Sequence, residues 1–266
     1  GLIRRNPHRN TLTRSTGGAG ALFSRSLSTR GFRVSHPIKL VVFDVAGTSV
    51  QDHGFVEHAF LSVSDRYGLG LDAGWIKSRM GVHKLAVMRE ALEAAGKTGS
   101  IEPEQLARAF EIAIDDAVDD GAAPAMDGFI ELMDDLRRAG VRVAFTTGFS
   151  RKTAERVLHG AEIDYPVLVA SDEVSAGRPS PEIVLEAMRR SGIEDPGQVA
   201  VVGDTPSDLG SGMNAQTALV IGIGHGTHEL CDLEDHPHTH LAADCDALRM
   251  ILAPRTGIPS NEHTHG

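Results

Sequence analysis

The chain has 266 residues, of which 41% are hydrophobic and 23% charged, with a formal net charge of −10 at pH 7. These values are typical of a soluble globular protein, and no apolar run approaches the roughly 18 residues that a membrane helix needs. Residues 1–38 contain seven arginines and no acidic residue, so +7 lies there and the remainder has a net charge of −17. So acidic a body argues against nucleic acid as a partner, because phosphate backbones need clustered Lys and Arg.

The first 38 residues lack the pattern of a folded domain. They are rich in Arg, Ser and Thr, which is the composition of a mitochondrial or plastid transit peptide. A disordered leader, or an upstream start wrongly assigned in a GC-rich genome, would look the same. We expect this segment to lie outside the fold. We also expect a cytoplasmic protein, unless the segment is a transit peptide that directs it to a mitochondrion or plastid.

From residue 39 onward, short apolar strands alternate with amphipathic helices. The apolar run 40–43 is a predicted strand that ends at Asp44. Further strands are predicted at 141–147, 166–170, 199–205 and 217–223, and helices at 128–139, 151–158, 181–191 and 207–214. This alternation predicts an α/β fold with a Rossmann-like, doubly wound parallel sheet and right-handed crossovers.

Residues 55–120 interrupt this rhythm. They predict one helix after another, at 56–67, 75–79, 84–95 and 103–119, with no convincing strand between them. We therefore expect a helical insertion after the first strand, with hinges at 51–54 and 121–126. The sheet domain would comprise 39–54 and 121–252, and residues 253–266 are predicted to form a loose tail.

Polar residues stand where three of the predicted strands end. Asp44 ends the first strand, Thr147 the second, and Asp204 the strand at 199–205. Ligands of doubly wound sheets bind beyond the carboxyl ends of the strands, so these side chains define the predicted site. Asp208 follows Asp204 by four residues, and such a pair of carboxylates suits Mg²⁺, which takes oxygen ligands.

Four motifs in this order resemble those of the haloacid dehalogenase (HAD) superfamily. The first motif of its phosphatases usually reads D-x-D-x-T; here Asp44 is retained but Ala46 replaces the second aspartate, which protonates the leaving alcohol. The others are Thr147-Gly148, Arg178, and Asp204 with Asp208. Each of these alone is weak, since a Thr-Gly pair is usually a turn and a lone arginine usually a surface residue.

The resemblance implies a role for each motif. Asp44 would attack phosphorus and form an aspartyl-phosphate that water hydrolyses. An Asp44 oxygen, the Ala46 carbonyl and Asp204 would hold Mg²⁺, with Asp208 orienting metal-bound water or supporting the loop. Thr147, Gly148 and Arg178 would bind the phosphoryl group. The insertion at 55–120 resembles the small α-helical cap of one HAD subclass.

The cap sequence MGVHKLAVMREAL at 80–92 resembles the Met-Gly-x-x-Lys segment of the phosphonoacetaldehyde hydrolase (phosphonatase) family. In that family the lysine forms a Schiff base with the substrate aldehyde, and alanine follows the nucleophile by two residues, as Ala46 does here. The resemblance implies that Lys84 forms the imine, with Met80 and Gly81 close to the substrate. An iminium accepts the electrons of a breaking C–P bond, so this chemistry does not need the alcohol-protonating acid.

Two positions depart from the phosphonatase pattern. That family has a histidine thought to shuttle protons three residues after its lysine, where this chain has Val87. It also has tyrosine after its Thr-Gly, where this chain has Phe149. His83 is adjacent to Lys84 and points elsewhere on a helix. The substrate is therefore expected to be phosphonoacetaldehyde or another small phosphonate or phosphorylated carbonyl compound.

Two other functions remain open from the sequence. Lys84 could instead grip a distal phosphate or carboxylate, as cations do in many caps of this type. The protein would then be a phosphatase or phosphomutase for a small phosphorylated metabolite, although it lacks an acid at position 46. A non-catalytic HAD-fold binding protein is the third reading, and retention of the motif residues argues against it. By analogy alone, the resemblance suggests a homodimer.

The C-terminal region holds the remaining metal-binding residue types. Cys231 and Cys245 are expected to be reduced. Five histidines gather between 225 and 240 and could chelate zinc, but their spacing lacks the tight Cys/His pairs of structural zinc sites. We expect a polar loop there, with residues 224–227 near the mouth of the active site.

Overall fold

The structure, a computed structural model, describes residues 37–260. The predicted leader therefore lies outside the described residues, except at its end. Ile38 was assigned to the leader, but its side chain is buried in the core and its backbone N–H donates to the carbonyl of Arg255. No helix within 37–260 is long and apolar enough to cross a membrane.

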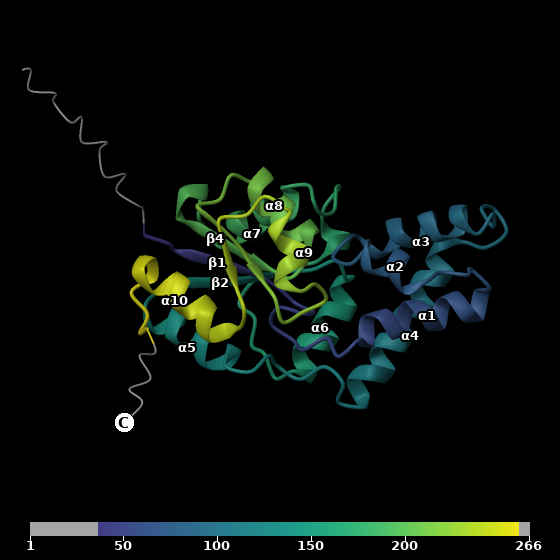
Figure 1. Cartoon of the computed structure of the whole chain (residues 1–266), viewed down its shortest axis with the longest axis horizontal. Coiled ribbons are helices and arrows are strands. Elements are labelled where there is room, and N and C mark those ends of the chain that lie inside the picture. Colours follow the sequence, from purple (N-terminus) through teal and green to yellow (C-terminus); the bar gives the residue numbers. More distant parts are fainter. Residues whose placement is uncertain (1–36, 261–266) are drawn as a thin grey trace, which may run out of the picture. The chain divides into compact units, whose positions relative to one another are not determined.

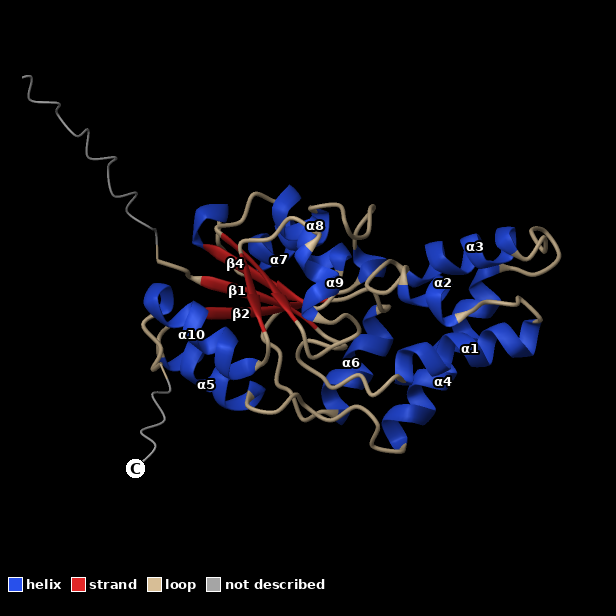
Figure 2. Ribbon diagram, viewed as in Figure 1, coloured by secondary structure: helices blue, strands red, loops and turns tan. Residues whose placement is uncertain are grey.

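Six parallel strands form one sheet (Figure 2). They are β1 (Leu40–Asp44), β2 (Arg142–Thr146), β3 (Leu168–Val169), β4 (Val199–Gly203), β5 (Leu219–Ile223) and β6 (His240–Ala242), in the order β3-β2-β1-β4-β5-β6. Strand β1 is central, since Leu40 is in register with Arg142 on one side and Val199 on the other. The predicted α/β, doubly wound fold is confirmed.

Helices cover both faces of the sheet, which explains why its strands are apolar throughout. Val41 and Phe43 pack on one face with α5 (Phe129–Arg138), α6 (Arg151–Gly160) and α10 (Cys245–Thr256). Leu40 and Val42 point the other way, into a cluster with α7 (Glu182–Arg190). The same face carries α8 (Pro206–Asn214) and α9 (Leu230–Glu234), whose Leu209 and Leu233 pack with Val220 of β5. Short 3₁₀ turns occur at η1 (Ser171–Glu173) and η2 (Pro196–Gln198).

Residues 55–120, here called the cap segment, contain four helices: α1 (Phe55–Tyr67), α2 (Ala73–Lys77), α3 (Lys84–Ala94) and α4 (Pro103–Asp119). The rings of Phe60 and Phe110 pack between α1 and α4 with centroids 4.6 Å apart. Polar contacts join this segment to the sheet domain, including the 2.8 Å ion pair of Lys77 with Asp232. The Lys84 N–H also donates to the Gly148 carbonyl, so the cap segment meets the loop that follows β2 (Figure 1).

The C-terminal region differs from the sequence-based expectation. The histidine-rich stretch was predicted to be a polar loop, but α9 lies within it and β6 begins at its last residue, His240. The predicted loose tail begins at 253, yet α10 continues to Thr256 and Ile258 is buried. These elements are short or only half buried, so their apolar periodicity is weak. Cys231 and Cys245 are both free thiols, as expected.

Candidate active site

The candidate site lies beside β1, at the point in the sheet where the order of the strands reverses. Asp44 is the last residue of β1, Thr147 directly follows β2, and Asp204 directly follows β4. Because β2 and β4 flank β1 on opposite sides, the connections that leave their carboxyl ends diverge and leave a crevice above β1. The strands therefore bring together the three residues that the sequence predicted to meet.

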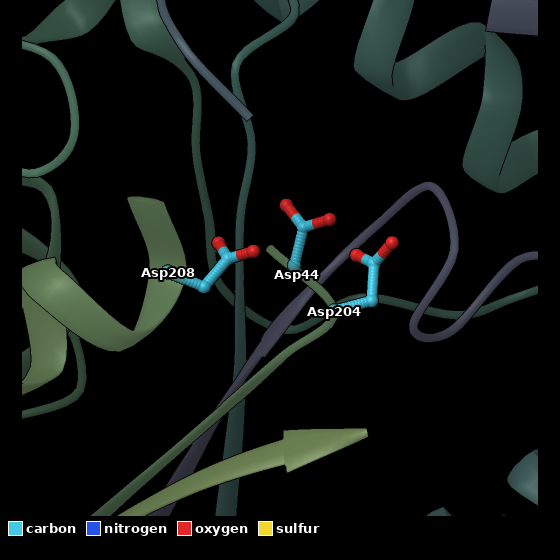
Figure 3. A group of neighbouring side chains, drawn as sticks. All are labelled: Asp44, Asp204 and Asp208. Atoms are coloured by element: carbon cyan, nitrogen blue, oxygen red, sulfur yellow. The ribbon is translucent and has the colours of Figure 1, made fainter. Parts of the chain in front are cut away.

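Three aspartates converge in this crevice (Figure 3). One carboxylate oxygen from each of Asp44, Asp204 and Asp208 lies within 4.8 Å of the others, and all three side chains are buried. Asp204 accepts hydrogen bonds from the Thr48 hydroxyl at 3.2 Å and the Thr227 N–H at 2.6 Å. Asp208 lies in the first turn of α8 and accepts from the Thr205 hydroxyl at 2.6 Å, which fixes its orientation.

Arg178 is the cation nearest to these carboxylates. Its Nη1 lies 2.6 Å from Asp44 Oδ1 and 2.5 Å from Asp208 Oδ1, and its Nη2 donates to the Thr146 hydroxyl. Arg178 therefore neutralises part of the negative charge of these three aspartates, here called the acidic cluster, and it does not line the pocket described below. Its predicted contact with the phosphoryl group stays a prediction.

The acidic cluster retains more negative charge than Arg178 can balance. Burial raises the pKa of Asp44 to about 6, although the Arg178 charge opposes the shift. Burial, together with the charge of Asp44, also raises the pKa of Asp204 well above its usual value. Three oxygen donors with a surplus negative charge fit a hard divalent cation such as Mg²⁺, which would relieve both shifts.

The loop after β1 is shaped around Asp204. Gly47 has a φ of +85°, and a Cβ at this position would lie 2.3 Å from Asp204 Oδ2, so only glycine fits. Ala46, which precedes it, lines the pocket. The side chain at 46 thus offers no proton donor at the place where HAD phosphatases have their acid.

The crevice narrows to a small pocket of about 20 Å³, close to the space that one water molecule needs. Residues of both the sheet domain and the cap segment line this pocket, and most of the residues predicted for the site are among them. The lining residues are Asp44, Ala46, Asp52, Val56, Met80, Gly81, Lys84, Thr147, Gly148, Phe149, Thr205 and Thr227.

Lys84, the first residue of α3, brings an amine into this pocket from the cap segment. Its Nζ lies 5.3, 5.9 and 5.4 Å from the ring centroids of Phe60, Phe110 and Phe149. The residue is only 9% exposed. Burial lowers the pKa of Lys84 from 10.5 to about 8, against the charge of Asp44, which raises it. The amine is therefore neutral far more often near neutral pH than an exposed lysine would be.

Residues close to Lys84 in the sequence were predicted to point away from the site or to lie beside it. His83 Nδ1 accepts from the Ala86 N–H at 3.4 Å and is absent from the lining of the small pocket, so it points elsewhere, as expected. Val87 is fully buried among apolar side chains. Gly81 has a φ of +76°, and a Cβ there would lie 2.5 Å from Thr205 Oγ1, so glycine allows the cap segment to approach α8 closely.

Sequence reasoning missed several residues of the pocket. Thr205 and Val56 were overlooked as lining residues, and Asp52 was assigned only to a hinge. An acid at 52 was visible in the sequence, but only the fold shows that the chain returns to the pocket at that point. The expected approach of residues 224–227 to the site is confirmed for Thr227, which lines the pocket and donates to Asp204.

Known proteins resemble this chain in sequence and in fold. Residues 38–216 match the family described as haloacid dehalogenase-like hydrolase. A phosphonoacetaldehyde hydrolase of Parabacteroides distasonis is 31% identical over 81% of this chain and 87% of its own length. One from Bacillus cereus strain AH187 is 29% identical over 73% of this chain and 78% of its own length.

Solved structures share the fold. A hydrolase from Pseudomonas syringae has a TM-score of 0.73 at 21% identity, covering 81% of this chain and 98% of its own. A β-phosphoglucomutase from Clostridium difficile has a TM-score of 0.72 at 16% identity, covering 83% of this chain and 97% of its own. The chain belongs to the haloacid dehalogenase-like hydrolases and is an enzyme. Within that family it is similar to phosphonoacetaldehyde hydrolases.

Proposed function

We propose that this enzyme cleaves the C–P bond of phosphonoacetaldehyde or a close analogue, with Mg²⁺ as cofactor, Lys84 as the imine-forming amine and Asp44 as the nucleophile. The observation that carries the proposal is the placement of a buried, partly neutral lysine in the same small pocket as the buried aspartate. The curated relatives are named for this activity, which supports the same substrate.

The amine chemistry follows from the environment of Lys84. Neutral Nζ adds to the aldehyde carbon, and loss of water gives an iminium ion. The aromatic rings around Nζ keep water away from the amine and can stabilise the cation that forms. The iminium then accepts the electron pair of the C–P bond, so the leaving group departs as an enamine. Because no alkoxide forms, Ala46 is sufficient where a phosphatase needs an acid.

The phosphoryl group is transferred to Asp44. A carboxylate oxygen of Asp44 forms the new P–O bond as the C–P bond breaks, and water then hydrolyses the aspartyl-phosphate. Mg²⁺ held by Asp44 and Asp204 would screen the negative charge of nucleophile and substrate. The hydroxyl of Thr147 and the backbone of Gly148, which line the pocket, are suited to orient the phosphoryl oxygens.

The pocket, as the structure shows it, is too small for a whole substrate. Its volume of about 20 Å³ is close to that of one water molecule, so we expect substrate to enter only when the cap segment moves away from the sheet domain. Within residues 37–260, Lys84 is the only lysine or arginine that lines the pocket. A phosphorylated metabolite with a second anionic group would need this same lysine as its clamp, and would still lack an acid at Ala46.

Borohydride trapping tests the proposal. The enzyme, incubated with phosphonoacetaldehyde and Mg²⁺ and reduced with borohydride, should acquire a stable two-carbon or phosphonoethyl adduct on Lys84, located by peptide mass mapping. Lys84→Arg should abolish the adduct and phosphate release. Lys152→Arg, an exposed lysine of α6, is the matched control and should change neither.

The absence of an adduct, with phosphate still released from ordinary phosphate esters, would overturn the proposal. Lys84 would then act as a substrate clamp, and the enzyme would be a phosphatase or phosphomutase.

A further inference from the structure

Asp52 is an acidic residue of the pocket that belongs to none of the four motifs. It lies in the loop between β1 and α1 and lines the same cavity as Asp44 and Lys84. Its Oδ1 accepts the backbone N–H groups of Gly54 at 3.0 Å and Val56 at 3.3 Å. These bonds hold the carboxyl group in a defined orientation at the start of α1.

The charges around Asp52 connect it with the reacting groups. Burial raises the pKa of Asp52, while the Lys84 charge on α3 opposes the shift. Its own charge acts on Lys84 and on Asp204, which follows β4. Asp44 lines the same pocket. A carboxyl group in this setting keeps its proton closer to neutral pH than an exposed aspartate does.

The proposed reaction needs a group that moves protons beside Lys84. The phosphonatase pattern has a histidine for this task, but Val87 at that position cannot titrate. Among the residues lining the pocket, the side chains that titrate in the ordinary pH range are Asp44, Asp52 and Lys84. Asp44 attacks phosphorus and Lys84 forms the imine, so Asp52 is the remaining acid.

We propose that Asp52 is the proton-transfer residue for imine formation and imine hydrolysis at Lys84, an inference that rests on the proposed function. The protonated carboxyl of Asp52 gives its proton to the hydroxyl of the carbinolamine, the C–O bond breaks, and water and the iminium ion form. After C–P cleavage and protonation of the enamine by solvent, water adds to the product iminium. The Asp52 carboxylate takes the proton of that water and is returned to its acid form.

A purely structural role would be to start α1 by accepting two backbone N–H groups. Asp52→Asn separates the two roles, because asparagine keeps the Oδ1 acceptor but cannot transfer a proton. Asp72→Asn is the matched control: Asp72 accepts the Trp75 N–H at the start of α2 and does not line the pocket.

The measurement is the rate of borohydride-trapped adduct formation on Lys84 with phosphonoacetaldehyde, followed across pH together with the midpoint of thermal unfolding. We expect Asp52→Asn to keep the unfolding midpoint and to slow trapping by about 10²–10⁴-fold, with loss of the pH dependence caused by the Asp52 acid. Asp52→Glu should recover part of the rate. Asp72→Asn should match the wild type in both readouts.

The two proposals fail in distinguishable ways. No adduct in the wild-type enzyme would contradict the proposed function itself. A wild-type adduct that forms at an unchanged rate and with an unchanged pH profile in Asp52→Asn would overturn the role of Asp52. If that variant did not fold, Asp52→Ser, which also accepts backbone N–H groups and does not titrate, would be judged by the same criteria.

Discussion

Arg178 Nη1 donates to Asp44 Oδ1 across 2.6 Å, and the two side chains are 1% and 7% exposed. The same nitrogen lies 2.5 Å from Asp208 Oδ1. One buried cation thus serves two buried carboxylates, which come from the end of β1 and the first turn of α8. The contact with Arg178 therefore helps to orient the Asp44 carboxylate at the end of β1.

Removing the cation should destabilise the fold. Arg178→Met leaves two buried carboxylates without their partner, so we expect the free energy of unfolding to fall by about 3–5 kcal/mol in metal-free buffer. Denaturation by urea measures this. Asp44→Asn in the same background should recover part of the loss, because one of the unpaired charges is gone.

Arg189→Met is the control for this experiment. Arg189 forms an ion pair with Glu186 on α7, but its side chain is 72% exposed. Exposed pairs contribute about 0–1 kcal/mol, so this variant should unfold almost as the wild type does. An equal loss in both variants would show that the burial of the Arg178 pair has no special importance.

The pH dependence of imine formation should report the pKa of Lys84. Burial lowers this pKa to about 8, and only the neutral amine attacks an aldehyde. In Asp52→Asn, which lacks the proposed acid, the trapping rate should therefore rise about tenfold per pH unit below pH 8 and level off above it. A rate that still rises steeply toward pH 10 would indicate an ordinary, solvated lysine.

The ring of Phe149 should contribute to that shift. Phe149→Ala removes an aromatic wall of the pocket and admits water to Lys84, so the pKa of the amine should rise and the pH–rate profile should move to higher pH. The same change should cost about 3–5 kcal/mol of stability.

Leu252→Ala separates the two effects of that substitution. Leu252 is buried in α10, among the core residues of the sheet domain. Its truncation should cost about 2–5 kcal/mol but leave the pH profile in place. A profile that moved in both variants would mean that global destabilisation, and not the environment of Lys84, sets the pKa.

Mg²⁺ should stabilise the folded enzyme through the acidic cluster. At a free concentration 100 times the dissociation constant, a bound ligand adds about 2.7 kcal/mol. In a domain of this size, that should raise the midpoint of thermal unfolding by roughly 5–10 °C. Calorimetry with and without the ion measures the shift.

Asp204→Asn should abolish this stabilisation, because it removes the charge of one of the three clustered oxygen donors. Asp134→Asn, at an exposed carboxylate of α5, should retain it. A shift that survived in Asp204→Asn would place the metal elsewhere in the protein.

Much of the fold could be predicted because its signals are local. The strands β1, β4 and β5 are continuous apolar runs, and a strand covered on both faces must be apolar throughout. Strand β6 and the end of α10 were missed because a three-residue edge strand and a partly exposed helix leave little periodicity.

The sequence by itself determined the chemical groups: the nucleophile candidate Asp44, the missing acid at Ala46 and the lysine of the cap segment. Their motifs are contiguous, so the order of residues is sufficient to recognise them. Only the tertiary structure decided the state of those groups. The pKa of Lys84 is lowered because residues distant in sequence bury its amine. Asp52 reaches the same pocket because of the way the chain folds. Both depend on how α1, α3 and α4 pack over the strand ends.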